Sequence, residues 1–305
     1  MLASLRLFFS VRGVIEVETP LLAATASSHP DLRPIAALRS NATGPCIRQL
    51  WLQTSPESHM KRLLAAGSGP IYQICKAFRD GEQDAIHNPE FTMIEWYRPG
   101  FDLHQLMSET EELVRGLLDR PQAERISYAR LFHIHLALDP HTVPPDDLRR
   151  LCQSKGLTHS TVSSNRDRDP WLKLLMESCI QHKLGHERPC FVFDFPASQA
   201  CMARIRPGNP GVAERFELYL DGVELANGYH ELDDPTEQLS RFENENSSLQ
   251  ALGREPVPLD EHLLSALASG LPDCSGAALG LDRLLMLKFS ASSISEVISF
   301  TTDRA

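Results

Sequence analysis

Hydrophobic and polar positions follow two periods along this chain, and each change of period marks a predicted element. Residues 71–79 and 90–98 are rich in aliphatic and aromatic side chains and flank a polar stretch. This pattern predicts two antiparallel strands joined by a loop. From residue 103 to 118, apolar residues recur at helical spacing behind Asp102, and Gln105 completes a capping box. We therefore expect an amphipathic helix there.

The N-terminal quarter predicts a mixture of short elements. Residues 2–12 favour a helix, 14–17 a short strand, and 25–46, rich in Pro, Ser, Asn and Gly, a loop or irregular hairpin. After a strand at 50–53, Ser55-Pro56 is a good helix start, with Ser as N-cap and Pro in the first turn. That helix should run to about Ala66.

The C-terminal third returns to strands, at residues 190–195, 213–220 and 223–231. Residues 275–280 are small and favour a loop that leads into a helix beginning near Gly280. Short hairpins and flanking helices predict an α+β fold on an antiparallel β-sheet flanked by helices. We expect a single domain over 1–305, with 120–190 as a possible small helical insertion.

Composition narrows the function classes. The chain is 42% hydrophobic and 23% charged, and no apolar run reaches membrane-spanning length. A net charge of −10 without a long basic stripe disfavours an extended nucleic-acid footprint. Seven scattered cysteines form no Cys-x-x-Cys pair, which favours reduced thiols and a cytoplasmic protein.

The strand pair around Asp221-Gly222 carries the clearest geometric inference. Asp-Gly is a strong signal for a two-residue hairpin turn, so Tyr219 should pair with Glu224, and Glu217 with Ala226. The two glutamates would then share a face, about 7–8 Å apart at the backbone. Such a pair suits magnesium bound to phosphates, but the pattern taken alone favours a solvated sheet face. Strict alternation puts Asn227 and Glu231 on the opposite face, although Gly228 could mark a bulge that re-aims one of them.

Two other segments carry groups suited to a nucleotide triphosphate. Arg79 ends the first strand, and Asn88 and Phe91 follow the polar loop. A guanidinium can bind phosphate oxygens, an amide can orient a ligand and a ring can stack on a base. Gly280 and Arg283 stand where the small-residue segment enters its helix. Each signal is weak alone.

Together these segments resemble the catalytic domain of class II aminoacyl-tRNA synthetases, lysyl branch. The first class motif, which forms the dimer interface in that family, is matched by residues 16–20. The second motif is matched by 78–79 with 87–97, the third by 276–283, and the lysyl-type metal and substrate hairpin by 213–217 with 224–228. The match covers nearly the whole chain in the family's order.

A closer resemblance is to the elongation factor P β-lysine ligases, lysyl-tRNA synthetase paralogues without the anticodon-binding domain. It is carried by residues 54–64, 96–99, 195–200 and 272–276. The chain begins almost at the first motif, so we expect no such domain ahead of it and no tRNA partner. Lysyl synthetases usually have glycine at the position of Ala278, whereas the ligase family has alanine.

The resemblance implies that ATP and (R)-β-lysine, or lysine, form an aminoacyl adenylate with Mg²⁺, and that the acyl group passes to a lysine ε-amine of elongation factor P. It implies a homodimer and no membrane association. Catalytic roles fall to Arg79, Glu224 and Arg283, and metal binding to Glu217 and Glu224. Nucleotide-binding positions are Arg79, Asp80, Gly81, Asn88, Phe91, Glu224, Leu225, Gly280 and Arg283. Amino-acid-binding positions are Ser55, Pro56, Glu57, Tyr97, Asn227, Glu231 and Ala278.

The chain departs from the family at the loop after Arg79. The family has Arg-Asn-Glu where this chain has Arg79-Asp80-Gly81, with Glu82 one place late. The family also has an arginine at the position of Ala85 or Ile86. ATP use could be weakened, or Arg283 and Glu82 could compensate. Two alternatives therefore stay open: a stand-alone lysine-type ligase with another acceptor, and a catalytically weakened paralogue that only binds.

Overall fold

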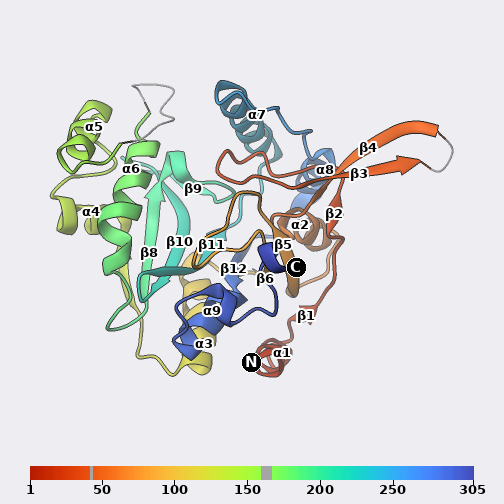
Figure 1. Ribbon diagram of the computed structural model, residues 1–305, viewed down its shortest axis with the longest axis horizontal. Helices are drawn as coiled ribbons and strands as arrows, with labels where there is room; N and C mark the ends of the chain where they lie inside the picture. The colour runs from red at the N-terminus through yellow and green to blue at the C-terminus, as the bar shows by residue number, and fades with distance from the viewer. Residues whose placement is uncertain (42–43, 159–166) are drawn as a thin grey trace. The chain divides into compact units, whose positions relative to one another are not determined.

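The computed structural model describes residues 1–41, 44–158 and 167–305 (Figure 1). The side chain of Cys46 and residues 159–166 of the expected insertion lie outside the described residues. The chain forms two compact units. Unit 1 comprises Met1–Phe101 and Asp233–Ala305, and unit 2 comprises Asp102–Leu232. Unit 2 thus begins before the expected insertion at 120–190, and the single domain over 1–305 stays a prediction.

The main sheet of unit 1 contains strands β1 (Ile15–Glu16), β5 (Ile71–Phe78), β6 (Glu90–Pro99) and β12 (Cys274–Gly280). The predicted strand pair is confirmed, because β5 and β6 are antiparallel neighbours with Gln73 opposite Glu95. β12 continues the antiparallel order beside β6, and only β1 pairs in parallel. Met93 to Tyr97 are all buried, so β6 is covered on both faces.

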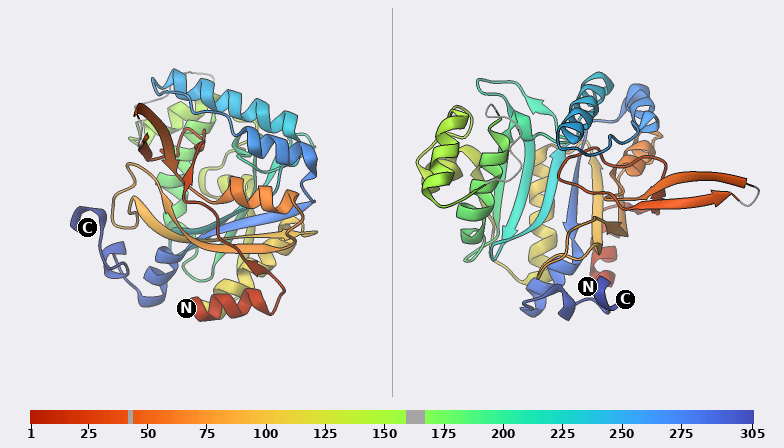
Figure 2. Two further views of the ribbon diagram at one scale, coloured as in Figure 1. Left: turned by 90° about the vertical axis from the view of Figure 1, so that its right-hand side faces the viewer. Right: turned by 45° about the horizontal axis from the view of Figure 1, so that its top comes forward.

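Helices cover both faces of this sheet. In α1 (Leu2–Ser10), Phe9 stacks on Tyr72 with ring centroids 4.5 Å apart. α2 (Glu57–Ala65) lies on the other side of β5 and β6 (Figure 2). On that side Ser55, two residues before the helix, donates a hydrogen bond to Glu95. This alternation follows from strand geometry, since adjacent strand residues project to opposite faces.

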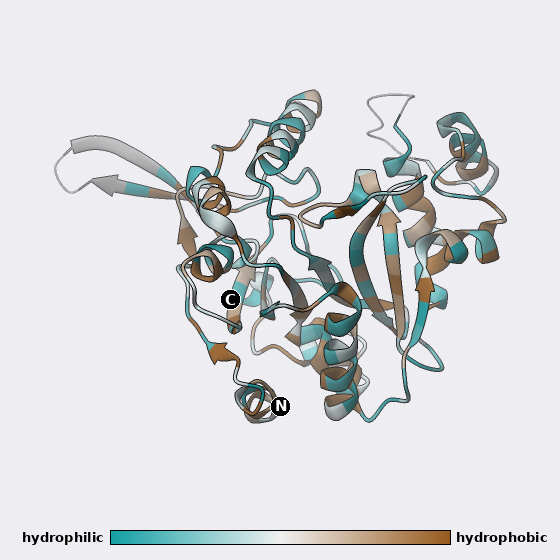
Figure 3. Cartoon of the chain, turned by 180° about the vertical axis from the view of Figure 1, so that it is seen from behind, coloured by the Kyte–Doolittle hydropathy of each residue, from teal (hydrophilic) through white to brown (hydrophobic). Residues whose placement is uncertain are grey.

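The remaining elements of unit 1 are peripheral. α8 (Glu261–Gly270) packs on α2, and α9 (Leu281–Phe289) follows β12. α7 (Pro235–Ala251) is mainly hydrophilic along its length (Figure 3), and only Gln238 and Leu249 are buried. A second sheet has the order β2 (Leu22–Ala23), β4 (Gly44–Leu52), β3 (Ala36–Asn41), and β3 and β4 form an arm that extends away from α2 and α8 (Figure 1). The irregular hairpin expected at 25–46 is thus partly a regular one.

Two predictions in unit 1 were wrong in detail. The segment 275–280 is not a loop but most of β12, which pairs with β6 from Cys274 to Gly280. Its small residues have weak strand propensity, but a long ladder with a central strand outweighs propensity. The helix expected from Ser55-Pro56 begins at Glu57, and Ser55 caps it from outside by accepting a hydrogen bond from the Glu57 N–H at 3.0 Å.

The strands of unit 2 follow one another in the order β11 (Val223–His230), β10 (Val212–Leu220), β8 (Cys190–Pro196), β7 (Glu124–Ser127), with β9 (Ile205–Arg206) also beside β10. Only β7 pairs in parallel, with β8. α3 (Leu103–Leu118) begins with the predicted capping box of Asp102 and Gln105.

The rest of unit 2 is the expected helical segment. It contains α4 (Tyr128–Leu136), α5 (Pro145–Ser154), α6 (Asp169–Leu175) and the short turns η1 (Met176–Ile180) and η2 (Gln181–Lys183). Buried residues from these helices, including Phe132, Leu148 and Leu172, join Val192 of β8 in one hydrophobic core. Nowhere in the described ranges is a helix both long and apolar enough for a membrane span.

Candidate functional site

One face of the unit 1 sheet combines bulky polar side chains with very small ones. Residues directly opposite each other on antiparallel strands project to the same face. Tyr97, Glu95 and Met93 of β6 stand opposite Gly276, Ala278 and Gly280 of β12. Since the β12 residues carry at most a methyl group, they occupy little space beside the β6 side chains. Ala278 adds its methyl directly opposite Glu95.

A carboxylate cluster occupies this face, and it brings together the predicted substrate residues of unit 1. The buried Glu95 accepts hydrogen bonds from the Ser55 hydroxyl at 2.8 Å and the Tyr97 hydroxyl at 2.6 Å. Glu57 forms an ion pair with Lys61, whose Nζ lies 2.7 Å from Glu57 Oε1 and whose side chain is 1% exposed. Sequence reasoning gave no role to Glu95 or Lys61. The signal for Glu95 was a charged residue within an alternating core strand.

The electrostatics of the cluster favour a cationic ligand. Burial and the nearby charge of Glu57 raise the pKa of Glu95 from 4.5 to about 7. The two hydroxyl donors and Lys61 act in the opposite direction. A buried carboxylate with a raised pKa is stabilised in its charged form by a nearby cation, because the cation replaces the hydration that burial removes. The cluster is therefore suited to binding an ammonium group.

Arg79 begins the loop between β5 and β6, residues 79–89, which we call the β5–β6 loop. Phe91 lies beside it, near the start of β6. The Arg79 guanidinium carbon lies 5.0 Å from the Phe91 ring centroid. Arg79 Nη1 is 3.7 Å from Glu82 Oε1, so the displaced glutamate still reaches the arginine. Asp80 and Gly81 are exposed. A guanidinium over an aromatic ring is compatible with the predicted phosphate and base contacts.

Asn88 is buried and its amide group binds the protein itself. Its Nδ2 donates to the Glu90 carbonyl at 2.6 Å, and its Oδ1 accepts from the Thr302 N–H at 3.0 Å. Asn88 therefore anchors the C-terminal segment to the β5–β6 loop. Its role in orienting adenine stays a prediction.

The side chain of Arg283 links the first turn of α9 to the β5–β6 loop. One of its terminal nitrogens donates to Nε2 of His87, whose Nδ1 lies 2.8 Å from Asp84 Oδ1. The preceding residue, Asp282, accepts from the Thr92 N–H at 2.7 Å. These contacts fix the start of α9 against β6. Sequence reasoning missed Asp84, which no family motif marked.

The predicted hairpin is present in unit 2, but its register was partly wrong. Asp221 and Gly222 both have positive φ, as the tight turn requires, and Tyr219 pairs with Glu224. A bulge then intervenes, so Glu217 pairs with Asn227 and not with Ala226. The extra residue reverses the alternation beyond it. Asn227 therefore shares the face of Glu217, contrary to the prediction.

Glu217 is buried and held by its own strand. Its two carboxylate oxygens accept from Arg215 and from the Tyr219 hydroxyl. Burial, and the charge of Glu224, raise the pKa of Glu217, whereas Arg215 lowers it. Hard oxygen donors of this kind fit magnesium, which commonly takes one or two carboxylates and completes its shell with phosphate and water oxygens. Among the described residues no group of three or more His, Cys, Asp or Glu could hold a metal ion, so protein ligands alone would not form a cage.

The remaining predicted residues of unit 2 have different surroundings. Asn227 Nδ2 donates to the Tyr229 hydroxyl at 2.9 Å. Leu225 is 2% exposed and belongs to the core, and Glu231 is 1% exposed. Glu231 follows β11 in an isolated bridge with Ala203. The ligand-binding roles of these residues stay predictions.

Comparison with known proteins identifies the family. The model of the class II tRNA synthetases (D, K and N) matches residues 1–304. The chain belongs to this family. A protein of Edwardsiella ictaluri named elongation factor P–(R)-β-lysine ligase is 48% identical over 308 residues, covering 100% of this chain and 94% of the relative. Proteins of the same name from Salmonella dublin and Salmonella paratyphi B are 47% identical with the same coverage.

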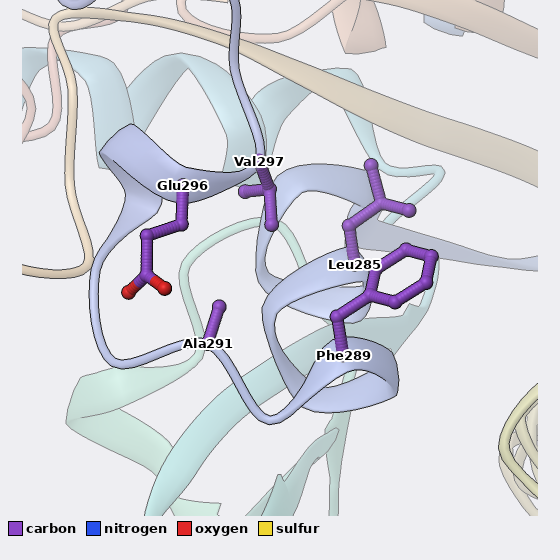
Figure 4. A pocket seen from close by; sticks show the side chains of 5 residues that line it. All are labelled: Leu285, Phe289, Ala291, Glu296 and Val297. Atoms are coloured by element: carbon purple, nitrogen blue, oxygen red, sulfur yellow. The ribbon is translucent and has the colours of Figure 1, made fainter.

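A small pocket in unit 1 is lined by none of the residues discussed above. It lies beside the last turns of α9 and is lined by Leu285, Phe289, Ala291, Glu296 and Val297 (Figure 4). The carboxylate of Glu296 points away from the apolar side chains and caps the turn η4 (Ile294–Glu296) by accepting from the Ser292 and Ser293 N–H groups. The Glu296 carboxylate at the edge of this pocket therefore already has backbone hydrogen-bond partners.

Proposed function

We propose that this class II synthetase family member is an ATP-dependent, AMP-forming ligase. It activates (R)-β-lysine, or lysine, and transfers it to a lysine ε-amine of elongation factor P. The amino-acid carboxylate attacks the α-phosphorus and pyrophosphate leaves. The acceptor amine then attacks the acyl carbon, loses a proton and displaces AMP.

The observation that carries the proposal is the carboxylate cluster between α2 and the unit 1 sheet. Glu95 and Glu57 provide negative charge beside the Ser55 and Tyr97 hydroxyls, where a diammonium amino acid would find complementary partners. The relatives named elongation factor P–(R)-β-lysine ligase, 47–48% identical over the full chain, support the specific substrate pair. Ala278, opposite Glu95, narrows the pocket by one methyl group relative to glycine.

The nucleotide is assigned to the residues around the β5–β6 loop. Arg79 would bind the α-phosphate and stabilise the charge that develops during displacement. Phe91, within cation–π distance of Arg79, would stack on the adenine. Gly280 and Arg283 would line the pocket at the start of α9. In unit 2, Glu217 and Glu224 would hold Mg²⁺, which when bound neutralises phosphate charge.

The oligomeric state and the compartment belong to the same proposal. Leu7, Val11 and Ile15 are 64%, 68% and 56% exposed at the N-terminus, and β1 is coloured hydrophobic in Figure 3. Such an apolar surface is typical of an interface, which supports the homodimer. Six cysteines of the described chain are free thiols, in keeping with a reducing cytoplasm.

Pyrophosphate exchange tests the first step. The protein, ATP and Mg²⁺ should exchange pyrophosphate with (R)-β-lysine, and Arg79→Ala should reduce the rate about 100-fold or more. Arg130→Ala, an exposed arginine of unit 2, serves as the control. Exchange with α-lysine alone would favour the stand-alone ligase. Amino-acid binding without any exchange would favour the weakened paralogue.

A further inference from the structure

The β5–β6 loop closes on itself through Asp84. The exposed Asp84 carboxylate accepts from the Ile86 N–H at 2.8 Å, which forms a tight local turn. Its two oxygens also lie 2.8 and 2.9 Å from Nδ1 of His87. The Asp84 N–H in turn donates to the His87 carbonyl at 3.2 Å. The position of the His87 ring is therefore set by Asp84.

The contact with Arg283 indicates the tautomer of this ring. An arginine side chain has donors and no acceptor, so His87 Nε2 must be the acceptor in its hydrogen bond with Arg283. A ring that accepts at Nε2 carries its proton on Nδ1, which faces Asp84. The three side chains thus form a directed chain: guanidinium donates to imidazole, and imidazole donates to carboxylate.

These three side chains meet at a loop segment that has no lysine or arginine between Asp80 and Pro89. Asp84 directly precedes Ala85 and Ile86 in it. Arg283 is a long side chain whose free rotation would be lost on binding phosphate. Its stem already lies against Gly280, with side-chain carbons 3.7–3.8 Å from the position a β-carbon would take there. The hydrogen bond to His87 restrains the guanidinium at the other end.

We propose that Asp84 and His87 are positioning residues that pre-order Arg283 for the triphosphate of the nucleotide, beside a loop that has no cationic side chain of its own between residues 80 and 89. This inference rests on the proposed function, since it takes ATP as the ligand. Asp84 acts through His87, and His87 through Arg283. A carboxylate is used because it selects the imidazole tautomer with a free acceptor at Nε2.

The ATP affinity of Asp84→Ala distinguishes a positioning role for Asp84 from a simple effect of its negative charge. Removing a negative charge near a phosphate site should strengthen ATP binding by simple electrostatics. Loss of a positioning residue should weaken it. We expect Asp84→Ala to weaken ATP binding about tenfold and to leave AMP binding unchanged, since AMP lacks the terminal phosphates. Asp84→Asn should bind ATP like the wild type, because its amide oxygen still accepts from Nδ1–H.

The experiment is calorimetric titration of the full chain with Mg·ATP and with AMP. Glu255→Ala, which removes an exposed charge elsewhere in unit 1, is the matched control. In an Arg283→Ala background, Asp84→Ala should cause no further loss of ATP affinity. If Asp84→Ala does not fold, His87→Leu replaces it, because leucine also removes the acceptor.

Unchanged or tighter ATP binding by Asp84→Ala, or a full additional loss in the Arg283→Ala background, would overturn the inference. The same holds if the wild type does not bind ATP. A different result would refute the proposed function: the wild type would bind ATP but would show no pyrophosphate exchange with either lysine isomer.

Discussion

Replacing Glu95 by glutamine should make the protein more stable at alkaline pH and leave it nearly unchanged at acidic pH. Glutamine has the shape of glutamate, and its amide oxygen can still accept from the Ser55 or Tyr97 hydroxyl. What the substitution removes is the ionisable proton. Glu95 is 3% exposed, so solvent screening reduces its electrostatic effect very little.

The magnitude follows from the pKa of Glu95, which burial and the charge of Glu57 raise from 4.5 to about 7. Below the ordinary pKa, Glu95 is neutral in the folded and unfolded chains. As pH rises, the unfolded chain loses this proton first, so the free energy of unfolding falls until the folded pKa is passed. The full decrease in the free energy of unfolding is about 3 kcal/mol. The Glu95→Gln variant does not show this decrease, because glutamine does not ionise.

The assay is urea unfolding of the wild type and Glu95→Gln at about pH 5 and pH 8, with midpoints and slopes compared. The stability of the variant relative to the wild type should rise by roughly 2–3 kcal/mol between these two pH values. Glu90→Gln, at an exposed glutamate of the same strand, should show almost no change. A Glu95→Gln difference that is the same at both pH values would refute the argument.

Three other predictions test separate parts of the account. Lys61→Met should destabilise unit 1 by about 1–3 kcal/mol, since it removes the ion-pair partner of the part-buried Glu57 and a positive charge close to the buried Glu95. Thermal unfolding checks this against the exposed Lys155→Met, expected within about 0.5 kcal/mol of wild type. Ala278→Val should raise KM for the amino acid about tenfold in pyrophosphate exchange, with KM for ATP unchanged, because the added methyls enter only the amino-acid side of the site. Val11→Asp should convert the proposed dimer to a monomer in sedimentation analysis, and a wild type that already sediments as a monomer would contradict the interface.

Local signals predicted much of the fold. Asp102 and Gln105 gave the start of α3, and Asp221-Gly222 gave the hairpin turn. In each case the structure depends on a few adjacent residues, which a single sequence displays. The small segment that became β12 was misassigned because its strand depends on pairing with β6, which is distant in the chain.

The candidate site was predictable to the extent that motifs mark it. Ser55, Glu57 and Tyr97 were named from the family resemblance, and the structure brings them together around Glu95. The bulge that places Asn227 opposite Glu217 was not predictable, because one extra residue in a ladder leaves no clear pattern in sequence. The partnership of Asp84 with Arg283 also depends on tertiary structure alone.

The central claim, transfer of a lysine-type acyl group to elongation factor P, is tested most directly by mass spectrometry of the acceptor. Elongation factor P is incubated with this protein, ATP, Mg²⁺ and (R)-β-lysine, and with Arg79→Ala in parallel. The account predicts a gain of one lysyl-sized group on a lysine of the acceptor with the wild type and no gain with the variant. An unmodified acceptor, despite adenylate formation by the wild type, would contradict it.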